Sequence, residues 1–451
     1  MSKVLNLEEI DLSCQSLAGK KLLILTDFIN ATYYLGFYYP LCTLADSFKL
    51  DWLALPQQEI KEKAKWQKPK LFCQTLLENY NPDLVIFNRY GLPYGSFWLY
   101  LCRDKGIPTV YFIDDDLLNI PLTFSKDIQR YQGTKELVEE RHHLLSNVNL
   151  IYTSTKYLAK KLSECFPEQT IVFGSYPPYL EGLIQKVAKP AHHQDKQKFT
   201  FGYMASRGHQ QDLEMILPAI AKILGNYPHT KFEVFGTISL PTQLTKFKNQ
   251  VKSHPVVPYN CFLQNLYELN WDWGLAPLQD TEFNRCKSPV KYLEYTACDI
   301  PVIASDSVVY NRLLNQENSI IAEAESWYES MELVINEPQK RLSFLPNAKS
   351  LCSDKFGLGK YRQDLLKVLQ LSFTEQQIQE LCSSNDDRQL QTKLSEILMS
   401  KEDWQCVSSI LKQENLDLKS RVPSQANIFY LLKQVARTVK AKITNKLQSF
   451  K

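Results

Sequence analysis

Residues 271–306 read WDWGLAPLQDTEFNRCKSPVKYLEYTACDIPVIASD, and this stretch decides the expected fold. A buried strand that begins at Trp273 runs into a polar loop, after which Ser288 is expected to cap a helix with Pro289 at its first position. The helix reaches Asp299, and a second apolar strand follows it. A strand, a helix and a further strand in this order form one unit of a parallel α/β sheet. The amino end of such a helix favours an anion.

The same alternation of short apolar runs and amphipathic stretches fills most of the chain, in two blocks. Residues 1–185 and 186–371 each predict one doubly wound, Rossmann-like domain. Residues 186–197 (KVAKPAHHQDKQ) are polar and without periodicity, and are expected to link the two. Two such domains place a ligand cleft between them, at the carboxyl ends of the strands. The expected strands are 21–26, 83–87, 109–113, 150–153, 170–173, 199–204, 231–235, 273–277, 301–305 and 319–321, and the expected helices are 32–48, 60–80, 96–105, 134–146, 212–226, 288–299, 327–336 and 358–371, the last of which closes the second domain.

Three polar residues near the start of the helix at 288 are spaced to share one face. Lys287, Lys291 and Glu294 stand at i, i+4 and i+7. A cation beside a pyrophosphate and a carboxylate two turns further along suit a nucleotide sugar, because the carboxylate can accept hydrogen bonds from both ribose hydroxyls. The alternative is a surface ion pair between Lys291 and Glu294, worth a few tenths of a kcal/mol.

Composition excludes several classes of protein. The chain has 451 residues, of which 44% are hydrophobic and 22% charged, and a formal net charge of +3 that gives no overall attraction to nucleic acid. Neither G-x-x-x-x-G-K-[ST] nor G-x-G-x-x-G occurs, which argues against a P-loop NTPase and a standard NAD enzyme. The 11 cysteines are scattered singly and are expected to be reduced thiols of a cytoplasmic protein. Neither a signal peptide nor a membrane span is expected.

Residues 372–451 differ from the two domains, because they are polar, helical in pattern and without a clear strand. Their final part, residues 424–451, contains no acid and six Lys/Arg, and its apolar residues recur at spacings of three and four. We expect this stripe to lie on an anionic membrane surface. The alternative is a helix that packs on the protein or on a partner. Sedimentation with anionic liposomes separates the two interpretations. Removal of residues 424–451 should abolish sedimentation if the stripe lies on the membrane, and unchanged binding would rule this interpretation out.

The segment K-S-P-x-K-Y-L-E-Y, followed by I-P-V-I-A-S-D, resembles the donor-site segment of GT-B glycosyltransferases close to family GT4. The start of the second domain, F-G-Y-M-A-S-R-G-H-Q-Q-D-L-E, resembles the same family. Y-F-I-D-D-D-L-L-N-I-P and N-L-I-Y-T-S-T-K-Y-L-A in the first domain resemble its strand ends more loosely. The resemblance covers residues 18–371. It implies the GT-B fold, two Rossmann-like domains that face a cleft, and a nucleotide diphosphate sugar held by the second domain.

The resemblance also implies roles for individual residues. Glu294 matches the second glutamate of the family's E-x7-E signature, which is expected at the ribose. The first glutamate falls at Cys286, where this chain departs from the family, and Glu282 or Asn284 in the same loop is the expected substitute near the transferred sugar.

Further residues are expected around the diphosphate. By the same resemblance, Arg207 and Lys287 neutralise the leaving group, which carries the charge that develops in the reaction. For His209, in the loop that follows the first strand of the second domain, the alternative to a phosphate contact is a solvated side chain. The remaining candidates for donor binding are residues of the helix start: Ser288, Pro289 and Lys291.

Asp114, Asp115 and Asp116 end a strand of the first domain and allow three interpretations. One is a carboxylate that lines the cleft, with Asp114 as the candidate base for an acceptor hydroxyl. The others are a helix N-cap with solvated acids and a metal site, since hard cations prefer carboxylate oxygens. Asn88 and Arg89 end another strand and are further candidates for acceptor contact. Four tyrosines on the expected first helix either pack in the core or line an acceptor groove: Tyr33, Tyr34, Tyr38 and Tyr39.

Together these observations predict an enzyme that moves a hexosyl residue from a UDP- or GDP-sugar to a hydroxyl of a glycan or lipid-linked acceptor, in surface polysaccharide synthesis. The expected location is the cytoplasm, free or peripheral on the inner face of the plasma membrane. The resemblance implies a retaining, metal-independent reaction with no cofactor beyond the nucleotide sugar. Two alternatives are a nucleotide-sugar epimerase of the same fold, which needs no acceptor, and a non-catalytic sugar-binding scaffold, which the missing glutamate at Cys286 favours.

Overall fold

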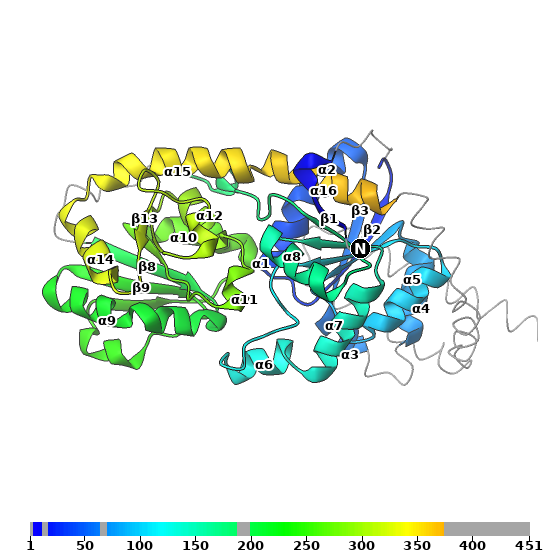
Figure 1. The fold of residues 1–451 in the computed structure, drawn as a ribbon, viewed down its shortest axis with the longest axis horizontal. Coiled ribbons are helices and arrows are strands. Elements are labelled where there is room, and N and C mark those ends of the chain that lie inside the picture. The colour runs from blue at the N-terminus through cyan, green and yellow to red at the C-terminus, as the bar shows by residue number, and fades with distance from the viewer. Residues whose placement is uncertain (1–2, 11–16, 64–69, 187–198, 374–451) are drawn as a thin grey trace, which may run out of the picture.

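The computed structural model describes residues 3–10, 17–63, 70–186 and 199–373. They form two lobes side by side, each built on one parallel sheet with helices on both faces (Figure 1). The predicted fold class, two Rossmann-like α/β domains, is confirmed. Residues 187–197 of the predicted linker and 374–451 of the predicted tail lie outside the described residues, so the membrane-binding stripe stays a prediction. No helix in the described ranges is both long and apolar enough to cross a bilayer.

The sheet of the first domain has seven strands, all parallel, in the order β1-β7-β6-β5-β4-β2-β3. Its central strands are continuous apolar runs because helices cover both faces. The strands predicted in this half are all present. The sequence did not predict β1 and β3 at the two edges, where partly exposed positions interrupt the apolar pattern. The strands are β1 (Lys3–Asn6), β2 (Lys21–Thr26), β3 (Asp51–Pro56), β4 (Leu84–Asn88), β5 (Thr109–Ile113), β6 (Leu150–Thr153) and β7 (Thr170–Phe173).

Several helices of the first domain begin at side-chain caps. Thr134 accepts a hydrogen bond from the backbone N–H of Leu137, and Thr155 does the same for Leu158. The predicted first helix is a continuous run whose middle, η2, is π-helical. The helices are η1 (Leu7–Glu9), α1 (Ala31–Tyr33), η2 (Tyr34–Tyr38), α2 (Tyr39–Phe48), α3 (Gln57–Lys63), α4 (Lys70–Tyr80), α5 (Gly95–Asp104), α6 (Lys126–Gln132), α7 (Lys135–Asn147), α8 (Lys156–Cys165) and η3 (Glu181–Leu183).

The second domain repeats the plan with six parallel strands in the order β10-β9-β8-β11-β12-β13. Its predicted strands are present, and β10, α10 and α15 are additional. The strands are β8 (Phe199–Ala205), β9 (Thr230–Gly236), β10 (Val251–His254), β11 (Trp273–Ala276), β12 (Val302–Ser305) and β13 (Ile320–Ala322). The helices that follow β8 in the chain are η5 (Arg207–His209), α9 (Gln210–Asn226), η6 (Thr242–Phe247), α10 (Tyr259–Leu269), α11 (Glu282–Arg285), α12 (Val290–Ala297), α13 (Val308–Asn311), α14 (Trp327–Asn336), α15 (Lys340–Phe356) and α16 (Leu358–Ser372).

The last described helix, α16, returns to the first domain. In Figure 1, α15 runs along the lobe of the second domain toward the first and leads into α16 beside α2. Asp364 accepts hydrogen bonds from the backbone N–H and the hydroxyl of Ser175, at 2.8 and 2.6 Å, and the Tyr361 hydroxyl donates to the Gly36 carbonyl at 3.1 Å. The expectation that this helix closes the second domain is therefore wrong. The spacing of apolar residues in α16 predicts which face of the helix is buried. It does not predict against which of the two domains this face packs.

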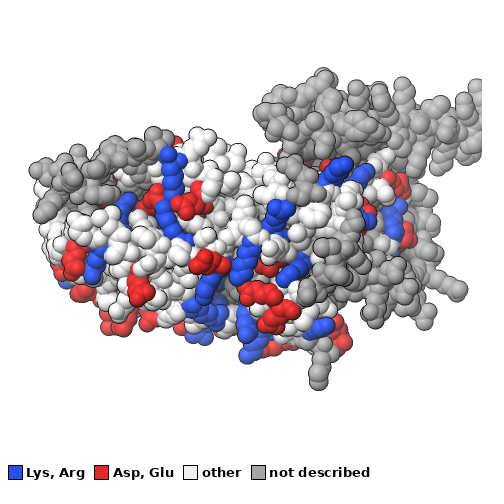
Figure 2. All heavy atoms as spheres, turned by 90° about the horizontal axis from the view of Figure 1, so that it is seen from above, with Lys and Arg blue, Asp and Glu red and all other residues white. Residues whose placement is uncertain are grey.

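The surface carries both signs of charge. Figure 2 shows basic and acidic side chains interspersed over the face seen from above, as the small net charge suggests. This face therefore offers no single-sign field of the kind that attracts nucleic acid.

Gly202→Ala tests the packing of the second sheet. Gly202 lies on β8, and a methyl group there would overlap the indole ring of Trp271, which is fully buried. Overpacking costs about 1–3 kcal/mol, and more where the neighbour cannot move, so we expect a clearly lower urea midpoint of unfolding. Gly225→Ala on α9 is the matched control, because its methyl group meets no atom within 4 Å and alanine favours a helix by about 0.5–1 kcal/mol. Equal midpoints for the two variants would contradict the prediction.

Candidate functional site

A cavity of about 640 Å³ lies between the two domains. The segments directly after β2, β4 and β5 line it from the first domain, and those after β8, β9 and β11 line it from the second. The carboxyl ends of the two sheets thus face each other, as predicted for a ligand cleft. The volume falls within the roughly 300–1,000 Å³ of typical small-molecule sites.

Helix α12 presents its amino end to this cavity. It starts at Val290, with Pro289 in the cap position and no side-chain hydrogen bond to its first turn. The prediction that Ser288 caps the helix with Pro289 at its first position is therefore wrong by one residue. Ser288 lines the cavity instead, whereas Pro289 is not among the lining residues. Backbone N–H groups at a helix start without a side-chain cap are available to an anion.

Lys287, Lys291 and Glu294 all line the cavity, as their spacing predicted. Burial lowers the pKa of Lys291 to about 8; Asp212 opposes this shift and Lys287 adds to it. The Lys291 amine therefore loses its proton just above neutral pH, well below the ordinary range of a lysine. A diphosphate placed beside it would stabilise the charged form.

His209 is packed between two charged groups. Its Nδ1 lies 2.8 Å from Asp212 Oδ2 and 3.3 Å from Lys291 Nζ, and its side chain is 18% exposed. Burial and the charge of Lys291 lower the pKa of His209 to about 4, so the imidazole is neutral at pH 7. The side chain lines the cavity, in contrast to the alternative of a solvated loop residue.

Glu294 is held by a tyrosine of the same domain. The Tyr259 hydroxyl donates a hydrogen bond to Glu294 Oε1 at 2.6 Å. Burial raises the pKa of Glu294 to about 7, although the hydrogen bond from Tyr259 and the charge of Lys291 oppose the rise. A carboxylate in this position has free lone pairs for hydroxyl donors.

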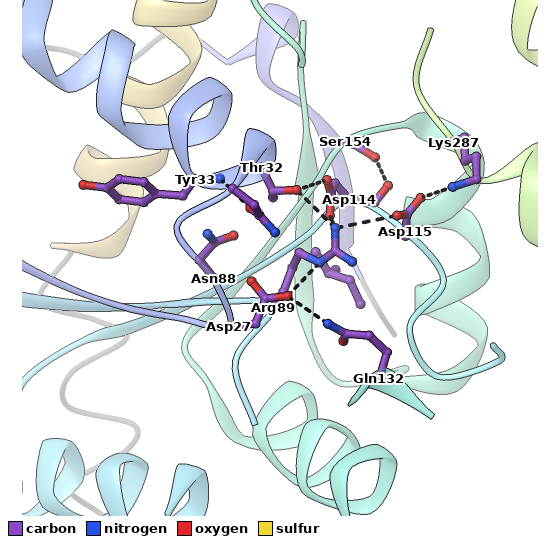
Figure 3. A network of polar contacts seen from close by, with 12 residues as sticks. Asp27, Thr32, Tyr33, Asn88, Arg89, Asp114, Asp115, Gln132, Ser154 and Lys287 are labelled. Carbon is purple, nitrogen blue, oxygen red and sulfur yellow. Dashed lines mark hydrogen bonds and ion pairs between the residues drawn. The ribbon is translucent and has the colours of Figure 1, made fainter. Parts of the chain in front are cut away.

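The first domain contributes a network of carboxylates around Arg89 (Figure 3). Arg89 follows β4 with a φ of 55°, a left-handed conformation that costs a non-glycine residue on the order of 1 kcal/mol or more. The buried Arg141 stabilises this turn by donating to the Arg89 carbonyl. The Arg89 guanidinium pairs with carboxylates that follow β2 and β5: Asp27 at 3.4 Å, Asp114 at 3.2 Å and Asp115 at 3.7 Å.

Asp115 connects the two domains, because its Oδ1 accepts a hydrogen bond from Lys287 Nζ at 3.0 Å (Figure 3). Burial opposes its ionisation, but Lys287 and Arg89 lower the pKa of Asp115 to about 2. Asp114 and Asp115 line the cavity, whereas Asp116 pairs with Lys161 at 2.7 Å. No helix starts at the triplet, so the cleft-lining interpretation agrees with the structure and the helix N-cap does not.

Arg207 lies outside the lining of the cavity. Its side chain is 63% exposed and pairs with Asp127 of α6 at 3.0 Å. In this arrangement Lys291, and not Arg207, is the second cation on the same wall as Lys287.

The loop residues expected to replace the missing glutamate also point elsewhere. Glu282 accepts hydrogen bonds from the Tyr157 hydroxyl at 3.0 Å, and Asn284 is buried beneath the loop; neither lines the cavity. Cys286 is fully buried in the apolar cluster of the first domain, and its carbonyl accepts a hydrogen bond from Thr155 Oγ1 at 2.9 Å. The structure brings Asp114, His209, Lys287, Ser288, Lys291 and Glu294 to the cavity and leaves out Arg207, Glu282, Asn284 and Pro289.

Three residues at the site were not identified from the sequence. Asp27 follows β2 directly, so its position at a strand end was a usable signal. Thr32 donates to Asp114 at 2.9 Å, and Tyr259 starts a helix that the sequence did not predict. Neither contact has a local signature, because the partners are distant in the chain.

Comparisons with known proteins concern the fold. No protein-family model matches the sequence, and no curated protein does. The solved structure of HepE from Anabaena in complex with UDP and glucose is similar with a TM-score of 0.55 and 14% identity, covering 78% of this chain and 99% of that one. HepE in complex with UDP-glucose gives the same values.

A glycosyltransferase from Rickettsia africae is similar with a TM-score of 0.52 and 12% identity, covering 79% of this chain and 99% of that one. Identities this low establish a common architecture and not a common substrate. The chain therefore has the GT-B fold of two facing Rossmann-like domains, which it shares with HepE and with the Rickettsia glycosyltransferase.

Proposed function

We propose that this chain is a glycosyltransferase that takes a hexosyl residue from a nucleotide diphosphate sugar and passes it to a hydroxyl of a glycan or lipid-linked acceptor. The observation that carries the proposal is the composition of the two cavity walls. One wall bears Lys287, Lys291 and a helix start without a side-chain cap, with Glu294 two turns along. The other bears Asp114 and Asp115.

The wall of the second domain suits a nucleotide diphosphate. Lys287 and Lys291 would bind the diphosphate and neutralise the charge that develops as it leaves. This positive charge comes from the chain itself, and on that basis we propose a metal-independent reaction. That the reaction is retaining is what the resemblance to family GT4 implies. Glu294 would accept hydrogen bonds from the ribose hydroxyls. HepE, which shares the fold, was solved with UDP-glucose, so uridine nucleotides are the first donors to test.

The wall of the first domain suits an acceptor hydroxyl. Burial raises the pKa of Asp114 above its ordinary value, although Arg89 opposes the rise. A carboxylate with a raised pKa is a better general base than an ordinary one, because its proton affinity is closer to that of the group it serves. Thr32 and Tyr176 donate hydrogen bonds to Asp114 Oδ2 and orient the carboxylate.

A thermal-shift screen against UDP, GDP, ADP and their hexose conjugates tests donor binding, because a ligand of the native state raises the melting temperature. Incubation of the binding donor with and without candidate acceptors then tests transfer. Release of nucleotide that depends on an acceptor supports the proposal. An epimerised donor in the absence of acceptor, or binding without any turnover, would contradict it and support the epimerase or the scaffold.

Substitutions on α12 and before it should separate binding from catalysis. We expect Lys287→Ala to lower kcat by about 10²–10³-fold, the usual cost of removing one group that stabilises developing charge. Glu294→Ala should raise the donor KM by about tenfold or more, because hydrogen bonds to a charged group are worth roughly 1.5–3 kcal/mol. Arg207→Ala is the control of equal charge change, and its exposed position predicts an effect of less than about threefold. A larger effect from Arg207 than from Lys287 would show that the diphosphate lies elsewhere.

Nucleotide affinity should fall as the pH rises through 8. The pKa of Lys291 is about 8 in the free protein, so binding of a diphosphate above this pH must take up a proton. The affinity then decreases by up to about tenfold per pH unit above 8, whereas below 8 this group contributes no pH dependence. Isothermal titration calorimetry between pH 7 and 9 measures how steeply the affinity decreases with pH. The Lys291→Met variant should bind the nucleotide more weakly, and its affinity should lack this pH dependence. An unchanged slope in Lys291→Met would assign the titration to another group.

A further inference from the structure

Tyr259 occupies an unusual place between the two domains. It is the first residue of α10, in the second domain, and it lines the cavity. Its hydroxyl donates to Glu294 Oε1 at 2.6 Å, and its ring contacts the ring of Tyr34 in the first domain, with the centroids 5.7 Å apart. One side chain thus touches both the candidate ribose carboxylate and the opposite domain.

The ring of Tyr259 is fixed by packing. It stacks on Phe262 at 5.6 Å with an interplanar angle of 12°, and Phe262 stacks on Phe235 at 4.9 Å with an angle of 3°. Tyr34 belongs to the π-helical section η2, where further tyrosine rings surround it. A ring packed against both Phe262 and Tyr34 keeps its hydroxyl in one position, so its hydrogen bond fixes the carboxylate rather than following it.

We propose that Tyr259 is a positioning residue: its hydroxyl holds Glu294 ionised and oriented toward the ribose of the nucleotide, and its ring ties that arrangement to the first domain through Tyr34. The inference rests on the proposed function, since it concerns the nucleotide site. Among the described residues, Tyr259 donates a side-chain hydrogen bond to Oε1 of Glu294. The Oε2 atom of Glu294 and the remaining lone pair of its Oε1 are then available for two ribose hydroxyls.

The charge of Glu294 depends on this contact. The titratable groups that interact with it are Tyr259 from α10, and Lys291 and Tyr295 from its own helix. Burial raises the pKa of Tyr259 far above 10, so its hydroxyl keeps its proton. The hydrogen bond that it donates to Glu294 stabilises the carboxylate form. Loss of the hydroxyl should therefore raise the pKa of Glu294 above about 7. Ribose recognition, which requires the carboxylate, would then be lost at a higher pH.

Tyr259→Phe tests the proposal, because it removes the hydroxyl and keeps the ring. We would measure the affinities of UDP and of 2′,3′-dideoxy-UDP, and of the corresponding guanosine pair, by calorimetry from pH 6 to 8. The ratio within each pair isolates the ribose hydroxyls, since both members carry the same phosphates and base. In the unsubstituted protein the ratio should favour the ribonucleotide and fall as the pH decreases through 7. In Tyr259→Phe the ratio should be about fivefold to tenfold smaller at pH 7. As the pH decreases, its fall should also begin at a higher pH than in the unsubstituted protein.

Two further variants complete the experiment. Tyr227→Phe removes a hydrogen bond of the same kind, to Glu332 at 2.9 Å and outside the cavity, and should leave the ratio unchanged. Glu294→Gln should abolish the preference for the ribonucleotide, and adding Tyr259→Phe to it should change nothing more, because the two residues act through one contact. Equal ratios in Tyr259→Phe and the unsubstituted protein would overturn the inference alone. Absence of binding by any of these four nucleotides and by ADP to the unsubstituted protein would overturn the proposed function, and the inference with it.

Discussion

Parallel pairing of all strands within each sheet is the constraint on which this molecule depends. A parallel sheet places the carboxyl ends of its strands at one edge, and the residues that follow those strands collect there whatever their distance in sequence. Two such edges face each other across the cavity. Asp27, Arg89 and Asp114 come from three different strands of the first sheet, yet they form one ion-paired group. Lys287 reaches this group from the other domain.

Burial between the two edges changes the chemistry of the groups that meet there. Glu294 and Lys291, which would be fully ionised in water at pH 7, have pKa values of about 7 and 8 because their charged forms are poorly solvated. The cavity therefore binds charge more strongly than the surface does, and a ligand that supplies the missing counter-charge gains most. The proposed diphosphate would supply that counter-charge beside Lys291, whereas ribose hydroxyls would supply hydrogen bonds to Glu294. The Asp115–Lys287 pair supplies part of the same compensation within the chain.

Contacts between the domains also explain why a cysteine suits position 286, where the resemblance to family GT4 leads one to expect a glutamate. This residue is fully buried within the apolar cluster of the first domain, directly behind the loop that carries Glu282. A glutamate in that position would bury a further carboxylate near Asp116 and Glu282, at a cost of several kcal/mol unless it were paired, and the neighbouring Lys161 already pairs with Asp116. A thiol fits, and the backbone carbonyl of the same residue accepts a hydrogen bond from Thr155. Cys286, a residue of the second domain, therefore helps to hold the two domains together.

The sequence by itself determined the two α/β domains and the face shared by Lys287, Lys291 and Glu294, because apolar periodicity and helical spacing are local properties. Tertiary structure decided which elements meet. Three features depend on contacts between residues far apart in the chain. They are the return of α16 to the first domain, the position of Arg207 outside the cavity and the hydrogen bond from Tyr259 to Glu294. No local pattern encodes such contacts, since they depend on how two sheets and their helices pack together. The edge strands β1 and β3 were missed for a related reason: they are only partly buried, so their sequence carries a weaker apolar signal than the central strands do.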